Sequence, residues 1–182
     1  MPLPEHELEA LGASLLGLEV RGSCLEVGTA YARTLIHLMS LFEDGERPPF
    51  VPIDPMTYFE GQAEKVRANL AEEGFSSDDV RVLEMTSGRA LAELPVDDDP
   101  FGGPLAFVFV DGDHRITGVT TDLRWARRVA EGGAICFHDY RPDAPGVRLA
   151  VDRFLPPHRH VPREAPVTSR LTVRTTGPST GP

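Results

Sequence analysis

The stretch AFVFVDGDHR, residues 106–115, places five apolar residues directly before two aspartates and a histidine. An uninterrupted apolar run of this kind is typical of a strand that is buried on both faces of a parallel sheet. The polar turn is therefore expected where that strand leaves the sheet. In open parallel α/β sheets, ligands bind beyond the carboxyl ends of the strands, so this turn marks a candidate site.

The rest of the chain repeats this form, because apolar segments alternate with helical patterns. Such alternation predicts right-handed crossovers and a parallel sheet covered by helices on both faces. The two last strand-like segments follow each other without a helix, which predicts an antiparallel hairpin at one sheet edge. Strands are expected at 23–29, 50–54, 80–85, 105–110, 133–139, 158–166 and 169–175, and helices at 5–19, 30–42, 60–74, 87–94, 117–132 and 146–155.

Length and charge narrow the class of protein. The 182 residues are enough for one domain, and the net charge of −10 argues against a nucleic-acid partner, which would need clustered Lys and Arg. No secretion leader and no apolar run approaching roughly 20 residues are present, so no membrane partner is expected. Cys24 and Cys136 lie in apolar runs and are expected to be reduced core thiols, which fits a cytoplasmic location.

Polar residues follow each of the first five predicted strands. Capping of the next helix is an alternative role for each one, since Asp, Ser and Thr cap helices well. Four of the five ends carry an acid, which is more than capping needs. These residues are Glu26 to Gly28, Asp54, Met85 to Ser87, Asp111 to His114, and His138 with Asp139.

The first turn, EVGTAYA at 26–32, allows close backbone approach at Gly28, and the following helix start can favour an anionic group. It is not the dinucleotide fingerprint, because Ala30 and Arg33 occupy the later glycine positions. Asp54, at the end of the second strand, stands where a carboxylate can accept hydrogen bonds from ribose hydroxyls. A nucleoside-containing ligand is therefore expected.

Four segments together resemble a known family. CLEVGTAYARTL (24–35), PIDP (52–55), the block from FVFVDGDH to GGAICFHDY (107–140) and RLTVRT (170–175) resemble the class I S-adenosylmethionine-dependent methyltransferases, in their small-molecule O-methyltransferase branch. The resemblance covers about residues 22–175 and implies a Rossmann-like, doubly wound, seven-stranded, mostly parallel sheet with an antiparallel C-terminal hairpin. The expected division is an N-terminal helix at 1–20, the methyltransferase domain at 21–176 and a flexible tail at 177–182.

The resemblance also implies which residues bind S-adenosylmethionine. Ala32 departs from the pattern, because this branch often has glycine there, and its methyl group would narrow the turn. Asp54 would take the ribose, and Thr86 and Ser87 would lie near the adenine. The other cofactor-binding residues implied are Glu26, Gly28, Thr29, Ala30, Tyr31, Thr34 and Asp111.

A divalent cation could bind the acceptor hydroxyl and lower its pKa. Asp111 and Asp139 end what are expected to be neighbouring strands and could supply two oxygen ligands. Metal-dependent relatives usually have a third acid or amide, where this chain has His138. If His138 is a ligand, the set suits Mn²⁺ or iron at least as well as Mg²⁺. Alternatively, His138 donates a hydrogen bond within the sheet and no metal binds.

His114 follows Asp111 by three residues, where catechol-type relatives have a lysine base. An imidazole suits proton abstraction near neutral pH, so His114 and Asp111 are the expected catalytic residues. The alternative for His114 is that it only orders the turn. Asp113 is expected to shape the turn, and Asp122 to pair with an arginine that follows it on the same helix.

The sequence thus favours an enzyme that methylates a hydroxyl of a small molecule. A nicotinamide-dependent oxidoreductase and a non-catalytic nucleoside-binding module are the alternatives. Residues 1–20 offer one helix to cover the acceptor. Either the acceptor pocket is open or a second subunit completes it, and we favour a homodimer.

Overall fold

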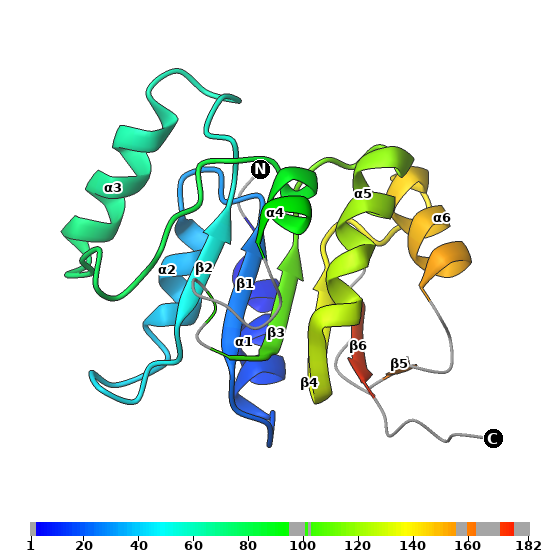
Figure 1. Cartoon of the computed structure of the whole chain (residues 1–182), viewed down its shortest axis with the longest axis horizontal. Helices are drawn as coiled ribbons and strands as arrows, with labels where there is room; N and C mark the ends of the chain where they lie inside the picture. The colour runs from blue at the N-terminus through cyan, green and yellow to red at the C-terminus, as the bar shows by residue number, and fades with distance from the viewer. Residues whose placement is uncertain (1–2, 95–100, 102, 156–159, 163–171, 177–182) are drawn as a thin grey trace.

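The protein is described by a computed structural model, which covers residues 3–94, 101, 103–155, 160–162 and 172–176 (Figure 1). In this part of the chain, six strands form one sheet in the order β2-β1-β3-β4-β6-β5. The strands are β1 (Ser23–Val27), β2 (Phe50–Ile53), β3 (Leu105–Val110), β4 (Val129–Phe137), β5 (His160–Pro162) and β6 (Thr172–Thr176). The helices are α1 (Glu5–Leu16), α2 (Arg33–Met39), α3 (Gln62–Glu72), α4 (Ser87–Glu93), α5 (Ile116–Asp122), the 3-10 helix η1 (Leu123–Arg128) and α6 (Pro145–Phe154).

The four strands β2, β1, β3 and β4 are parallel, which confirms the predicted α/β class. Strands β1 and β3 are buried along their whole length, as the apolar runs at 23–27 and 105–110 indicate. Their burial on both faces explains why no polar alternation is present in these segments. Because the four strands are parallel, their carboxyl ends lie at one edge of the sheet.

Alternate residues of the strands pack into two separate cores. On one face, Cys24, Phe107 and Phe109 pack against α1, α2 and α3. On the other face, Leu25, Val108 and Val110 pack against α4, α5, η1 and α6. This period of two is the geometry of a strand, and it gives the doubly wound, Rossmann-like arrangement that the sequence predicts. Cys24 and Cys136 are both buried, as predicted.

At the C-terminal side, β6 runs antiparallel to β4, and β5 runs antiparallel to β6. The segment between β5 and β6 and the tail predicted at 177–182 lie outside the described residues. None of the described helices has the length and apolar character that crossing a bilayer requires.

Two predicted elements differ from the structure. The segment 80–85 forms no full strand, because only Val80 and Leu83 make isolated parallel bridges, to Phe50 and Ile53. The helix predicted over 117–132 divides into α5 and η1, and its last four residues begin β4. Val129 pairs with Leu105 of β3, so strand pairing outweighs the helical pattern at this point.

Candidate active site

Strand order places the candidate site residues. The chain moves from β1 to β2 on one side, and β3 lies on the other side of β1, so the switch in strand order falls between β1 and β3. Ligands of open α/β sheets bind at such a switch point. Glu26, Asp54, Asp111 and His138, which lie at or directly after the ends of β1, β2, β3 and β4, consequently border one region.

The turn after β1 is tightly constrained. Gly28 has φ +86°, and a Cβ at this position would lie 2.4 Å from the backbone oxygen of Asp111. Only glycine fits such a close approach. Ala30 and Ala32 also have positive φ, of 47° and 67°, which costs a non-glycine residue roughly 1–2 kcal/mol. Ala32 is fully buried and is the N-cap of α2 in this strained conformation.

Asp54 braces this turn from the end of β2. Its Oδ2 accepts hydrogen bonds from the backbone N–H groups of Thr29, at 2.9 Å, and Ala30, at 3.4 Å. Its Oδ1 accepts from the N–H of Met56 at 2.8 Å. The structure therefore gives Asp54 a role within the protein itself. These bonds are compatible with the predicted role toward ribose hydroxyls, because a carboxylate has about four acceptor positions.

Glu26, the last polar residue of β1, is buried at the same edge of the sheet. Burial raises the pKa of its carboxyl to about 8. Its Oε2 is buried without a hydrogen-bond partner among the described residues. A buried, unsatisfied carboxyl oxygen is costly, which makes it a candidate contact for a cationic or hydrogen-bond-donating ligand group.

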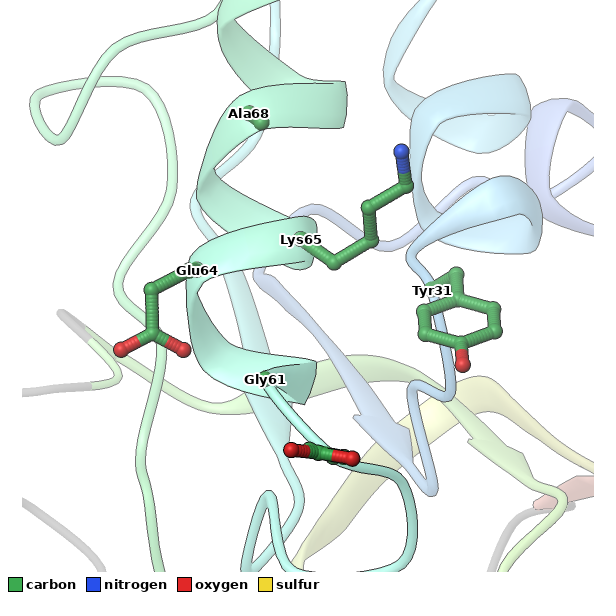
Figure 2. A pocket seen from close by; sticks show the side chains of 6 residues that line it. Tyr31, Gly61, Glu64, Lys65 and Ala68 are labelled. Carbon is green, nitrogen blue, oxygen red and sulfur yellow. The ribbon is translucent and has the colours of Figure 1, made fainter.

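Tyr31 and Thr34 complete the turn and the start of α2. Tyr31 is partly exposed, and its ring stacks on Phe59 with centroids 4.7 Å apart. Gln62 and Asn69 of α3 donate hydrogen bonds to the backbone oxygens of Ala30 and Tyr31, respectively. Figure 2 shows the cavity beside Tyr31, of about 530 Å³, whose other lining residues are Glu60, Gly61, Glu64, Lys65 and Ala68.

Thr86 and Ser87 lie at the start of α4, and both have structural partners. The Thr86 hydroxyl accepts a hydrogen bond from the N–H of Arg89 and caps the helix. The Ser87 hydroxyl accepts from Nε1 of the fully buried Trp125 at 2.9 Å. The sequence predicts that Asp122 pairs with an arginine, whereas the structure buries its side chain and gives it a hydrogen bond with Ser87. Burial raises the pKa of the Asp122 carboxyl to about 6, and the hydrogen bond with Ser87 opposes this shift.

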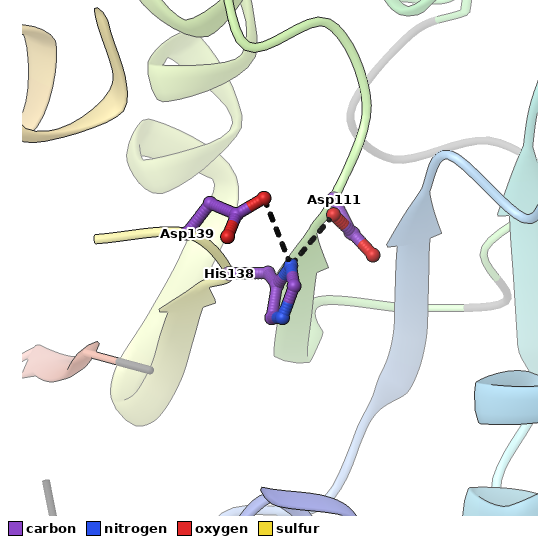
Figure 3. A group of neighbouring side chains, drawn as sticks. All are labelled: Asp111, His138 and Asp139. Atoms are coloured by element: carbon purple, nitrogen blue, oxygen red, sulfur yellow. Dashed lines mark hydrogen bonds and ion pairs between the residues drawn. The ribbon is translucent and has the colours of Figure 1, made fainter. Parts of the chain in front are cut away.

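The ends of β3 and β4 bring Asp111, His138 and Asp139 together (Figure 3). One ligand atom from each residue lies within 4.8 Å of the others. Nδ1 of His138 is 3.1 Å from Oδ1 of Asp111 and 3.5 Å from Oδ2 of Asp139. Asp139 has φ +54°, and its Oδ1 lies 3.1 Å from Nε of Arg141. Strained non-glycine residues of this kind concentrate at functional sites.

His114 also contacts both aspartates. Its Nε2 is 3.2 Å from Oδ1 of Asp111, and its Nδ1 is 3.4 Å from Oδ2 of Asp139. The hydrogen bond with Asp111 raises the pKa of His114, against the effect of burial. Burial raises the pKa of Asp111, but its hydrogen bonds with His114 and His138 outweigh this and lower it. The candidate base His114 thus contacts Asp111 and Asp139, which are themselves candidate metal ligands.

The remaining aspartate of the turn, Asp113, has a structural role. Its Oδ1 accepts a hydrogen bond from the backbone N–H of Arg115 at 3.0 Å, and its carboxylate pairs with the Arg115 guanidinium. The prediction that Asp113 shapes the turn is confirmed.

Sequence reasoning missed Glu7. This residue of α1 is 1% exposed, and its Oε2 lies 3.2 Å from Nε2 of His138. A signal was available, because Glu7 is spaced four residues before Leu11 and therefore shares the apolar face of the helix. An acid on a core-facing position indicates a buried partner.

Comparison with known proteins gives a family and a fold. A family profile described as a methyltransferase domain matches residues 25–140. No curated protein matches the chain. Among solved structures, the chain is similar to the O-methyltransferase TomG from Streptomyces achromogenes, which is involved in tomaymycin synthesis and was solved in complex with SAM. The identity is 21%, the TM-score is 0.67, and 97% of this chain and 82% of that chain are covered.

Two further structures have the same fold. An O-methyltransferase from Bacillus cereus in complex with SAH has 18% identity and a TM-score of 0.68, over 96% of this chain and 83% of that one. A putative O-methyltransferase from Klebsiella pneumoniae has 16% identity and a TM-score of 0.74, over 97% and 82%. At these identities, the likeness establishes the fold.

Proposed function

Because the chain belongs to the methyltransferase domain family, we propose that it transfers a methyl group from S-adenosylmethionine to a hydroxyl group of a small molecule. The observation that carries this proposal is the edge formed by Glu26, Gly28 and Asp54, where two buried carboxyl groups flank a turn whose position 28 admits only glycine. The structural neighbours solved with SAM or SAH support the same cofactor. The family match favours this function over the nicotinamide-dependent oxidoreductase.

The residues at this edge fit the cofactor. S-adenosylmethionine carries an ammonium and a sulfonium, and the unsatisfied Oε2 of Glu26 offers an acceptor for the ammonium. Asp54 would accept from the ribose hydroxyls while it braces the backbone of Thr29. Thr86 and Ser87 would border the adenine. Gly28, Ala30, Tyr31 and Thr34 would surround the methionine part, and Asp111 would border the same cleft.

Bound S-adenosylmethionine supplies an electrophilic methyl group, so the protein's task is to orient the acceptor oxygen and remove its proton. His114 would take this proton; its ring is 45% exposed, and its Nε2 is 3.2 Å from Oδ1 of Asp111. The hydrogen bond to Asp111 and the ion pair with Asp139 would stabilise the imidazolium that forms when His114 accepts this proton. Asp111 and His114 are thus the proposed catalytic residues.

Asp111, His138 and Asp139 would hold a divalent cation. Two carboxylates and an imidazole form a donor set that suits Mn²⁺ as well as Mg²⁺, and their ligand atoms are already grouped. Such a cation would bind the acceptor hydroxyl and lower its pKa. Oδ1 of Asp139 lies 3.1 Å from Nε of Arg141, so Oδ2, which lies 3.5 Å from Nδ1 of His138, would be the oxygen that binds the ion.

The test is calorimetric titration of S-adenosylmethionine into wild type, Asp54→Asn and Asp78→Asn, each with and without Mn²⁺. Asp78 is an exposed acid at the opposite end of β2 and serves as the matched control. We expect binding to weaken at least about tenfold in Asp54→Asn, because each tenfold loss equals about 1.4 kcal/mol and a charged hydrogen bond contributes about that much. Absence of binding to the folded wild type would overturn the proposed cofactor.

The acceptor would be a small molecule, identified by a screen for SAH release over phenols and sugar hydroxyls. A homodimer would be detected by sedimentation, and a cytoplasmic location by fractionation. A seven-stranded sheet would need residues 80–85 to pair beyond the bridges at Val80 and Leu83, which amide exchange would detect.

A further inference from the structure

Glu7 reaches the active-site edge from the first helix of the chain. Its carboxylate is buried, and it lies on the same helix as the core residues Leu8, Leu11 and Leu15. Burial of a carboxylate in apolar surroundings is costly unless a specific partner compensates it. One such partner is His138, whose Nε2 lies 3.2 Å from Oε2 of Glu7.

The two ring nitrogens of His138 face opposite sides. Nε2 faces Glu7, and Nδ1 faces Oδ1 of Asp111 and Oδ2 of Asp139. Glu7 therefore contacts the nitrogen that is turned away from the grouped carboxylates. A metal-ligating histidine almost always donates its other ring N–H to a carboxylate, carbonyl or water, and this partner fixes the orientation of the ring.

We propose that Glu7 is a positioning residue for a divalent cation: it accepts the Nε2–H of His138 and thereby directs Nδ1 toward Asp111 and Asp139. The inference rests on the metal site of the proposed function and adds to it a residue outside the family match at 25–140. Glu7 is not a ligand itself, because the imidazole ring lies between its carboxylate and the grouped ligand atoms. A purely structural Glu7 would anchor α1 without influence on the cation.

The experiment uses the chain of 182 residues, Mn²⁺ as the probe and four variants. Glu7→Met keeps much of the buried volume and removes the acceptor, whereas Glu7→Gln keeps an acceptor oxygen. Glu9→Gln changes an exposed acid on the same helix and is the matched control. The free Mn²⁺ signal in electron paramagnetic resonance gives the affinity, and spin-echo modulation detects an imidazole nitrogen bound to the ion. His138→Gln identifies the source of that modulation.

We expect Glu7→Met to weaken Mn²⁺ binding by about 10–100-fold and to reduce the His138 modulation. Glu7→Gln should restore most of the affinity, and Glu9→Gln should match wild type. Equal Mn²⁺ affinity and modulation in Glu7→Met and wild type would overturn the inference. So would equal losses in Glu7→Gln and Glu7→Met, since the hydrogen bond would then not be responsible.

Folding and cofactor binding are measured separately. If Glu7→Met does not fold, the wild-type spectrum decides, because a bound Mn²⁺ without modulation from His138 also overturns the inference. A wild type that binds no Mn²⁺ overturns both this inference and the metal site. If the wild type does not bind S-adenosylmethionine but the Mn²⁺ results are as expected, only the proposed cofactor is overturned. The role of Glu7 is then still supported.

Discussion

Nε2 of His114 lies 3.2 Å from Oδ1 of Asp111, so the candidate base is hydrogen-bonded to a candidate metal ligand. This contact raises the pKa of His114 above its usual value of about 6.5. In the metal-free protein, Asp111 consequently favours the imidazolium. A cation on the same carboxylate would compete with that interaction, because both draw on one oxygen.

We predict that Asp111→Asn lowers the pKa of His114 in the metal-free protein. A group whose pKa is raised on folding stabilises the protein fully below its unfolded pKa, and this contribution is lost as the pH rises through the folded pKa. The stability from His114 should therefore decline above about pH 6.5 in wild type and change less in the variant. Proton resonances of the ring, followed from pH 5 to 9 in EDTA, measure the shift. An unchanged His114 titration in Asp111→Asn would contradict the prediction.

Glu26→Gln should stabilise the cofactor-free protein above neutral pH. Burial raises the pKa of Glu26 to about 8, so folding becomes less favourable as the pH rises from the unfolded pKa, near 4.5, to about 8. The wild type should lose about 2 kcal/mol more than the variant between pH 6 and pH 8, since each pKa unit equals 1.36 kcal/mol. Urea unfolding of both proteins at the two pH values gives the difference. The variant should also bind S-adenosylmethionine more weakly, and parallel pH profiles would argue against a buried, neutral Glu26.

Gly28→Ala and Gly45→Ala separate backbone strain from steric exclusion. The two glycines have nearly equal φ, +86° and +85°, but a Cβ at position 28 meets the backbone of Asp111, whereas position 45 has no atom within 4 Å. We expect Gly45→Ala to cost about 1 kcal/mol and Gly28→Ala about 3 kcal/mol, because the second adds overpacking to strain. Denaturant midpoints measure both. Equal losses would mean that the close approach at Gly28 has no energetic weight.

Ser87→Ala should destabilise the protein whether or not Ser87 contacts the cofactor. The substitution removes the acceptor for Nε1 of the buried Trp125, and an unsatisfied buried donor costs about 1–3 kcal/mol. In a Trp125→Phe background, the same substitution should cost less, because no donor remains. A double-mutant cycle of unfolding free energies tests this coupling. A coupling energy near zero would count against the hydrogen bond.

Local patterns predicted the elements closely where burial alone decides them. The runs at 23–27 and 105–110 are apolar because both faces of these central strands are covered, and the polar turns after them identify the strand ends. The pattern was less informative at the sheet periphery. Residues 80–85 read as a strand but make two bridges only, and 129–132 read as helix but begin β4.

The sequence by itself determined the alternation of strands and helices, the edge that carries the acids and the candidate residues Asp54, Asp111, His114, His138 and Asp139. Only the tertiary structure decided which of these side chains contact one another. Strand order places His138 beside Asp111, and helix packing brings Glu7 against His138 across 131 residues of chain. Periodicity reports how each segment is buried, because it depends on near neighbours. The contacts between distant side chains depend on strand order and helix docking, which no local pattern encodes.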